Sequence, residues 1–344
     1  MSVEIVSFDP VAAADELLHA CYDVDAGVFK LDYPDRPIPT ADEYAGQLRR
    51  PQSMLGPRQI WLARDAEDGT VVGLATATFP EDENTGMAVV HVRVKPQRRR
   101  DGIGTEMFRT VLPAVRATGR ELIGSQGLKA GADGEKWASA HGFSRVSELI
   151  LQRLHIDASA EQWRQVGIPS GFHTRIWVGA LPEEMIAPCA AVLVHGNVGT
   201  IEQARRRELE WSEDRLRQFE VEIRESGNEL WTAAAVGDDD STVAAVTMIA
   251  VPPAVSEVCY QQDTVVLPEL RRRGLAAWTK SVLIGALATR RPDLEQIFSH
   301  IDHRNEAMLR TNERLGFRAD DRVARFEATV EDLGRTLGRG AGSQ

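Results

Sequence analysis

One short motif occurs twice in this sequence, and the two copies are half a chain length apart. The segment VKPQRRRDGIG begins at Val94, and VLPELRRRGLA begins at Val266. Their glycines, Gly102 and Gly274, are separated by 172 residues, which is half of the 344-residue chain. A Gly-Phe pair recurs at a similar spacing, beginning at Gly142 and Gly316. The chain is therefore predicted to be a duplication of one structural unit.

Each copy of the motif has the pattern of a strand, a basic turn and the start of a helix. In the second copy the apolar strand Val258–Val266 stops before Pro268, and a helix is predicted to begin at Gly274. A helix N-terminus presents unpaired backbone N–H groups and the positive end of the helix dipole. Arginines beside such a terminus favour an anion, and small residues let the anion approach the backbone. The predicted ligand of each motif is a pyrophosphate.

The composition and the first residues argue against several kinds of partner, site and location. The net charge of −11 and the isoelectric point near 5.3 argue against a nucleic acid or an anionic membrane surface as the main partner. Cys21, Cys189 and Cys259 are widely spaced, which favours neither a disulfide framework nor a zinc site. The first residues lack the basic and apolar segments of a signal peptide, so we expect a cytoplasmic protein.

With these residues in view, the chain resembles the GNAT superfamily of acyl-CoA N-acyltransferases. The core pattern of that family's motif A is Arg or Gln, two residues, Gly, one residue, then Gly or Ala, and both Arg99–Gly104 and Arg271–Ala276 satisfy it. The segment from Asn305 to Phe317 resembles the motif B region of tandem GNAT proteins, the kind that includes mycothiol synthase. The resemblance covers nearly the whole chain except its last few residues.

The resemblance implies a mixed α/β fold made of two tandem GNAT domains. Each is expected to contain a twisted, mostly antiparallel sheet that splays at the acyl-CoA site and carries helices on both faces. The expected division is 1–155 for the N-terminal domain, 156–169 for a connector, 170–335 for the C-terminal domain and 336–344 for a disordered tail.

The resemblance also implies acetyl-CoA as the co-substrate and assigns residues to it in both copies. Pantetheine is expected along the end of the strand before each loop, and the pyrophosphate on the loop itself. The expected cofactor-binding residues are Val92, Val94, Arg99, Arg100, Gly102 and Gly104 in the first copy, and Thr264, Val266, Arg271, Arg272, Gly274, Ala276 and Asn305 in the second.

The proton-transfer groups are less clearly marked. In the family a carboxylate on the fourth strand often serves as general base, and the positions reached by counting back from the loop glycines are Ala88 and Tyr260. Nearby candidates are Glu83 in the first copy, and Asp263, Tyr260 or Glu257 in the second. In a regular strand Asp263 lies on the face opposite Tyr260, so only a β-bulge would bring them together. A structural role for Asp263 is an equal alternative.

The family's general acid is often a tyrosine four residues before the glycine of Gly-Phe. That position holds Ala138 in the first copy and Asn312 in the second. Asparagine can form hydrogen bonds but cannot supply a titrating proton. Because Asn305, Asn312 and the polar Tyr260–Asp263 segment occur only in the second copy, that copy is predicted to be the catalyst.

The sequence therefore predicts transfer of an acetyl group from acetyl-CoA to a small amine. Two alternatives stay open: an acyl-CoA-binding protein without turnover, and an acetyltransferase for protein amines. No metal is expected, since His300 and His303 lack a third ligand and Asp238–Asp240 favours a hairpin turn over a calcium loop. Because of the duplication we expect a monomer, in which the two copies within one chain take the places of the two subunits of a homodimer.

Overall fold

The computed structural model describes most of the chain. Its description covers residues 2–50, 55–81, 83–196, 205, 207, 210–252 and 257–339. Two compact units are present: the first comprises Met1–Ser147, Glu202–Arg207 and Val323–Gln344, and the second comprises Glu148–Ile201 and Glu208–Arg322. Within the described ranges, no helix is long and apolar enough to cross a membrane.

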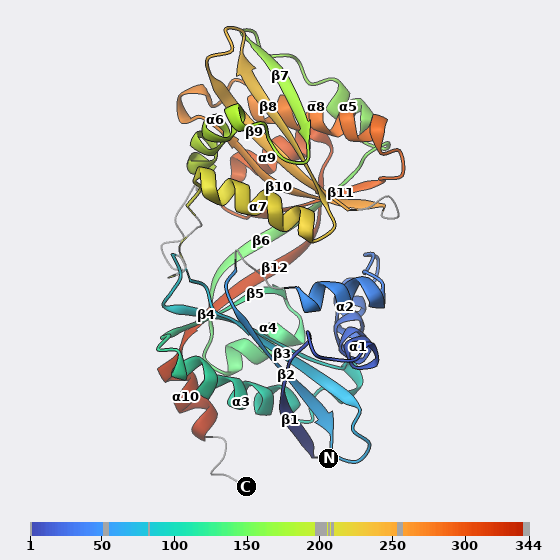
Figure 1. The fold of residues 1–344 in the computed structure, drawn as a ribbon, viewed down its shortest axis with the longest axis vertical. Coiled ribbons are helices and arrows are strands. Elements are labelled where there is room, and N and C mark those ends of the chain that lie inside the picture. Colours follow the sequence, from blue (N-terminus) through green and yellow to red (C-terminus); the bar gives the residue numbers. More distant parts are fainter. Residues whose placement is uncertain are drawn as a thin grey trace. The chain divides into compact units, whose positions relative to one another are not determined.

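The first unit contains a mixed sheet with helices on both faces (Figure 1). Its strands follow the order β1-β2-β3-β4-β5-β12. The elements are β1 (Val3–Phe8), α1 (Asp15–Asp32), α2 (Ala41–Arg49), β2 (Arg58–Asp65), β3 (Val71–Thr78), β4 (Met87–Val94), a 3₁₀ turn (Pro96–Arg98), α3 (Ile103–Ala117), β5 (Leu122–Lys129), α4 (Asp133–Ala140), the start of β6 (Ser144–His155), the end of β12 (Arg318–Thr329) and α10 (Val330–Arg339).

The second unit repeats this plan (Figure 1). Its strand order is β6-β11-β10-β9-β8-β7. The elements are the remainder of β6, α5 (Ala160–Arg164), β7 (Phe172–Val178), α6 (Glu183–Leu193), a 3₁₀ turn (Val194–Gly196), α7 (Glu213–Glu225), β8 (Glu229–Gly237), β9 (Val243–Val251), β10 (Val258–Val266), a second 3₁₀ turn (Pro268–Leu270), α8 (Leu275–Arg290), β11 (Gln296–Asp302), α9 (Glu306–Leu315) and the start of β12.

The final strands of the two repeats are exchanged between the units. β12, at the end of the second repeat, joins the sheet of the first unit, and β6, at the end of the first repeat, joins the sheet of the second unit. In the first unit β12 pairs antiparallel with β5, from Val323 opposite Lys129 to Thr329 opposite Leu122. In the second unit β6 pairs antiparallel with β11, with His155 opposite Gln296. The sequence division at 155 and 170 follows the repeats, whereas the compact units exchange these two strands. The repeats and the units are therefore different divisions of the chain.

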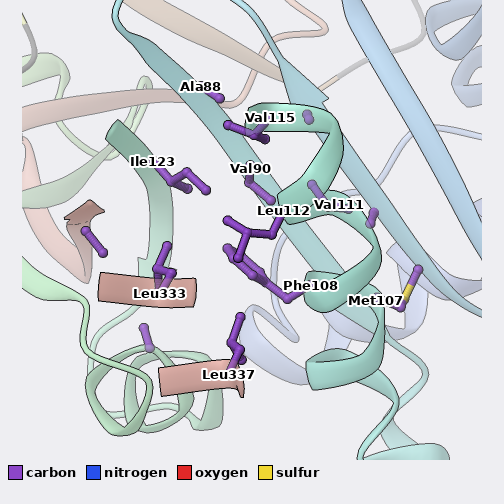
Figure 2. Close-up of a cluster of buried hydrophobic side chains, with 14 of the residues drawn as sticks. Ala88, Val90, Met107, Phe108, Val111, Leu112, Val115, Ile123, Leu333 and Leu337 are labelled. Atoms are coloured by element: carbon purple, nitrogen blue, oxygen red, sulfur yellow. The ribbon is translucent and has the colours of Figure 1, made fainter. Parts of the chain in front are cut away.

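The C-terminal helix belongs to the core of the first unit. Figure 2 shows Phe108 and Leu112 of α3 on the side of Leu333 and Leu337 of α10, whereas Met107 points away from these leucines. All five residues belong to one buried cluster. Leu333 and Leu337 are at most 3% exposed, and their burial stabilises α10, which ends at Arg339. The tail expected to be disordered from residue 336 is thus helical to residue 339. Residues 340–344 lie outside the described part of the chain.

Candidate functional site

Each unit contains a pair of parallel strands that separate after three residue pairs. In the first unit β4 pairs with β5 only over Met87–Val89, opposite Leu122–Gly124. In the second unit β10 pairs with β11 only over Val258–Tyr260, opposite Gln296–Phe298. Both longer strands then continue for several residues toward the basic loop. The expected splay is confirmed in both copies.

The separated strand ends direct backbone amides into these gaps. Lys95 donates its N–H to Val72 on β3, and Leu267 donates its N–H to Ala244 on β9. Amide direction alternates along a strand, so the residues next to Lys95 and Leu267 direct their amides to the opposite side. The N–H groups facing the gaps are those of Val92, Val94, Thr264 and Val266.

The two basic loops have the same backbone conformation. Arg100 and Arg272 both adopt positive φ, at 71° and 64°, which is uncommon for a residue other than glycine. Gly102 and Gly274 follow as the N-cap residues of α3 and α8, with φ of 81° and 84°. Neither cap supplies a side-chain hydrogen bond to the first-turn amides. The repeat thus preserves an anion-binding geometry as well as a sequence pattern.

The arginines of the first loop are paired with carboxylates. Arg98 forms ion pairs with Asp65 and Asp101. Asp133, at the start of α4, lies 2.9 Å from Arg100 and 3.8 Å from Arg99. These acids neutralise much of the positive charge that the sequence pattern offers to a phosphate.

The arginines of the second loop have a different environment. Arg271 donates to the carbonyl oxygens of Val266 and His195, at 3.3 and 3.1 Å. Arg272 and Arg273 are exposed, and within the described ranges neither has a carboxylate at ion-pair distance. Arg273 occupies the position of Asp101 in the repeat. The second loop therefore offers the stronger positive potential for an anion.

A β-bulge lies in β10 directly before this loop. Gln261 pairs with Ile249 and Thr264 pairs with Thr247, so β10 has one residue more than β9 between these positions. The buried Gln261 side chain donates to the Met248 carbonyl at 2.7 Å and to the Thr247 hydroxyl at 3.1 Å, which fixes the bulge. The extra residue places two neighbouring side chains, Gln262 and Asp263, on one face of the strand.

The bulge places Asp263 on the same sheet face as Tyr260. Val265, on this face, belongs to the buried cluster formed with α6 and α7, whereas Cys259 belongs to the cluster on the α8 face. Asp263 is exposed, and Tyr260 is 42% exposed with its ring 6.1 Å from that of Phe298. The condition set by the sequence for bringing Asp263 and Tyr260 together is met, although their roles stay predictions.

The extra residue also changes which residues correspond in the two copies. Tyr260 lies opposite Phe298 in the last parallel pair of its gap, and Val89 occupies that place in the first copy. The repeat spacing of 172 residues makes Tyr260 equivalent to Ala88 instead, because this spacing does not include the extra residue of the bulge.

Both predicted asparagines have partners within the protein. Asn305 is the N-cap of α9, where its side chain accepts from the Met308 amide at 3.1 Å. Asn312 is fully buried and donates to Gln152 at 2.8 Å. Its Oδ1 atom has no hydrogen-bond partner among the described residues. Each asparagine thus has a structural role, whatever its part in binding or catalysis.

Lys280 is a buried charged residue that the sequence reasoning missed. It lies on α8 with 1% exposure and 5.1 Å from the Phe317 ring centroid, and its Nζ atom has no hydrogen-bond partner in the described part of the chain. Burial lowers the pKa of this lysine to about 7. The repeat provided a signal: the first copy has the apolar pair Phe108 and Phe143, with ring centroids 5.7 Å apart, where the second has Lys280 and Phe317.

The structure gives no support to a metal site. Across the described ranges, no group of three or more His, Cys, Asp or Glu side chains is arranged to hold a metal ion. Asp239 accepts from the Ser241 amide at 3.0 Å in the turn between β8 and β9, as the hairpin prediction requires.

Comparisons with known proteins agree with the duplicated fold. Residues 18–130 match the acetyltransferase (GNAT) family model. A tandem GNAT protein from the clavulanic acid biosynthesis pathway is 22% identical, with a TM-score of 0.77 over 96% of this chain and 99% of that one. A GCN5-related N-acetyltransferase from Sphaerobacter thermophilus is 15% identical, with a TM-score of 0.69 over 95% and 96%.

A third structure shares the fold within a longer protein. The glucosamine N-acetyltransferase region of a fungal multi-domain β-N-acetylglucosaminidase is 14% identical, with a TM-score of 0.64 over 95% of this chain and 38% of that one. No curated protein sequence matches the chain. The family match is confined to residues 18–130, and the structural likenesses show that the chain as a whole has the fold of these tandem GNAT structures.

Proposed function

We propose that this protein transfers an acetyl group from acetyl-CoA to the amine of a small molecule, and that the second copy binds the acetyl-CoA. One observation carries the proposal. β10 separates from β11 after Tyr260 and continues to a loop whose arginines lack carboxylate partners within the described ranges. The matching first loop has paired arginines. The second copy therefore combines a splayed strand, a helix N-terminus and the stronger positive charge.

The second loop fits the phosphate end of the co-substrate. The first-turn amides of α8 would hold a pyrophosphate, with Arg271 and Arg272 as counter-charges. A Cβ atom on Gly274 would extend into open space, so the approach to these amides is clear of described protein atoms. The amides of Thr264 and Val266 would pair with the polar groups of pantetheine. In the first copy, Gly104 and its neighbours provide the same geometry with a weaker field.

The acetyl thioester supplies an activated carbonyl carbon, and the protein must prepare the amine. Asp263 is proposed to accept the ammonium proton, directly or through water, on the sheet face that it shares with Tyr260. The amine nitrogen then bonds to the carbonyl carbon while the carbon–sulfur bond breaks. The thiolate takes a proton from solvent, because a thiol with a pKa of about 8.5 is a good leaving group without a dedicated acid.

Binding of acyl-CoA without turnover is the second candidate function. It is favoured by Asn312, which occupies the position of the family's tyrosine but is fully buried. Acetylation of a protein amine is a third reading, and the same assay separates it from the first when peptides are included among the acceptors.

The proposal is tested by thiol release from acetyl-CoA with a panel of small amines and peptides. The wild type should release CoA with at least one small amine, and Gly274→Val should abolish release because a side chain there crowds the loop amides. Gly227→Val is the matched control: Gly227 has φ of 82° and open space around it, but it lies after α7. Equal activity of the two variants, or no activity of the wild type with any amine, would contradict the proposal.

A further inference from the structure

The first unit contains a cavity that the proposed function does not use. Its volume is about 320 Å³, and it lies between helices α1 and α2 and the strands β2, β3 and β4. Alternate residues of β4, namely Val89, His91 and Arg93, line this cavity. Ala88 and Val90 point instead to the α3 face, where Figure 2 shows them against the helix. The cavity therefore lies on the α1 and α2 face of the sheet, opposite the buried cluster of α3.

Among the described residues that line the cavity, the one carboxylate is already engaged. Asp25 on α1 accepts from the Tyr44 hydroxyl at 2.7 Å and lies 3.2 Å from Nε of Arg93. Burial and the neighbouring Arg93 lower the pKa of His91 to about 3, so this imidazole is uncharged at neutral pH. The negative charge of Asp25 and the positive charge of Arg93 therefore offset each other, and His91 adds no charge.

A second guanidinium in the cavity wall is held differently. Arg58, at the start of β2, donates to the Leu48 carbonyl at 2.6 Å, and burial lowers its pKa. Within the described ranges, no carboxylate lies at ion-pair distance from it. The lining groups carry one net positive charge, although the whole chain carries −11. A half-buried charge of this kind is stabilised by an anion with matching geometry.

We propose that this cavity binds a small organic carboxylate with an apolar body, and that Arg58 provides its counter-charge. The volume is within the range of ligand pockets, which starts at about 300 Å³. Leu48, Leu74 and Val89 supply an apolar wall for the body of the molecule. A guanidinium and a carboxylate have complementary planar geometry, which favours this anion over others.

The second copy presents the opposite charge on the corresponding face. At the repeat spacing, Asp263 and Val265 stand where His91 and Arg93 stand in the first copy. The first face therefore has a surplus of cationic groups, whereas the second offers an exposed carboxylate. A free amine fits the second face, and its ammonium would be repelled in the first cavity by Arg58.

Three molecules of one shape test the proposal on the full-length protein: 3-phenylpropionate, 3-phenylpropanamide and 3-phenylpropylamine. Calorimetry should give a dissociation constant for the carboxylate at least tenfold below that of the amide, and no binding of the amine. Arg58→Gln should weaken carboxylate binding at least tenfold. Arg58→Lys, which keeps the charge, should lose less than Arg58→Gln.

Two further variants show whether the carboxylate binds in this cavity. Thr76→Phe adds a large side chain to the β3 wall of the cavity and keeps Arg58, so it should also abolish binding. Arg272→Gln, in the second loop, should leave carboxylate binding unchanged, whether or not that loop binds acetyl-CoA. Circular dichroism checks that each variant is folded. The proposal is overturned if the amide or amine binds as tightly as the carboxylate, if a phosphate monoester competes better, if Thr76→Phe retains binding, or if the carboxylate does not bind.

Discussion

Replacing Lys280 with methionine should stabilise the second unit. The change removes a buried ammonium that has no hydrogen-bond partner among the described residues, and it keeps a long, flexible side chain beside Phe317. The first copy shows that an apolar residue is accepted here, because Phe108 occupies the equivalent position with 3% exposure. The native fold therefore does not require the positive charge.

The size of the effect follows from the lowered pKa. The pKa of Lys280 falls from 10.5 to about 7 on folding. A shift of one pKa unit corresponds to about 1.4 kcal/mol. Below pH 7, where the lysine is protonated in both the folded and the unfolded protein, its burial therefore destabilises the fold by roughly 5 kcal/mol. Above pH 7 the folded protein releases the proton and the unfolded chain keeps it. Stability then rises with pH at about 1.4 kcal/mol per unit, until the unfolded lysine titrates near pH 10.5.

Urea unfolding at pH 7.0 and 8.5 measures this prediction. Lys280→Met should raise the free energy of unfolding by about 3 kcal/mol or more at pH 7.0, and the gain should shrink by about 2 kcal/mol at pH 8.5. The three buried cysteines, whose pKa values burial raises to about 12, contribute equally to both proteins and cancel. Lys136→Met, an exposed control, should change stability by less than about 1 kcal/mol. No stabilisation, or a gain independent of pH, would refute the reasoning.

Three other outcomes are expected. Arg272→Gln should weaken CoA binding more than Arg100→Gln, because Asp133 already neutralises Arg100; equal effects measured by calorimetry would speak against the charge asymmetry. Asp263→Asn should lower the turnover number by a factor of about 100 or more with little change in CoA affinity, and a variant with normal turnover would remove Asp263 as the base. Light scattering should give a mass near 37.9 kDa, and twice that value would exclude the monomer.

Local patterns predicted the parts of the fold that depend on neighbouring residues. The repeat identified two copies of one unit, and the strand Val258–Val266 has the predicted bounds. The glycines and arginines of both loops adopt matching dihedral angles, as expected when one motif is used twice. The face taken by Asp263 depends on the bulge, because strand periodicity shows which face a side chain takes only while the strand is regular.

Features that depend on distant residues were not predictable in this way. The pairing of β12 with β5 joins Val323 to Lys129, and nothing local to either strand names its partner. The cavity near Arg58 draws its wall from two helices and three strands. The residues around Lys280 do not show that it is buried, and only its alignment with the apolar Phe108 of the first copy indicates a core position. In each case tertiary packing, rather than local propensity, decides the outcome.

Native mass spectrometry of the protein with acetyl-CoA tests the central claim most directly. We expect one tightly bound acetyl-CoA per chain in the wild type and in Gly102→Val, and none in Gly274→Val at the same concentration. Gly102→Val and Gly274→Val are matched, since both glycines are N-caps with nearly equal φ and open space around them. Loss of binding in Gly102→Val together with retention in Gly274→Val would contradict the account.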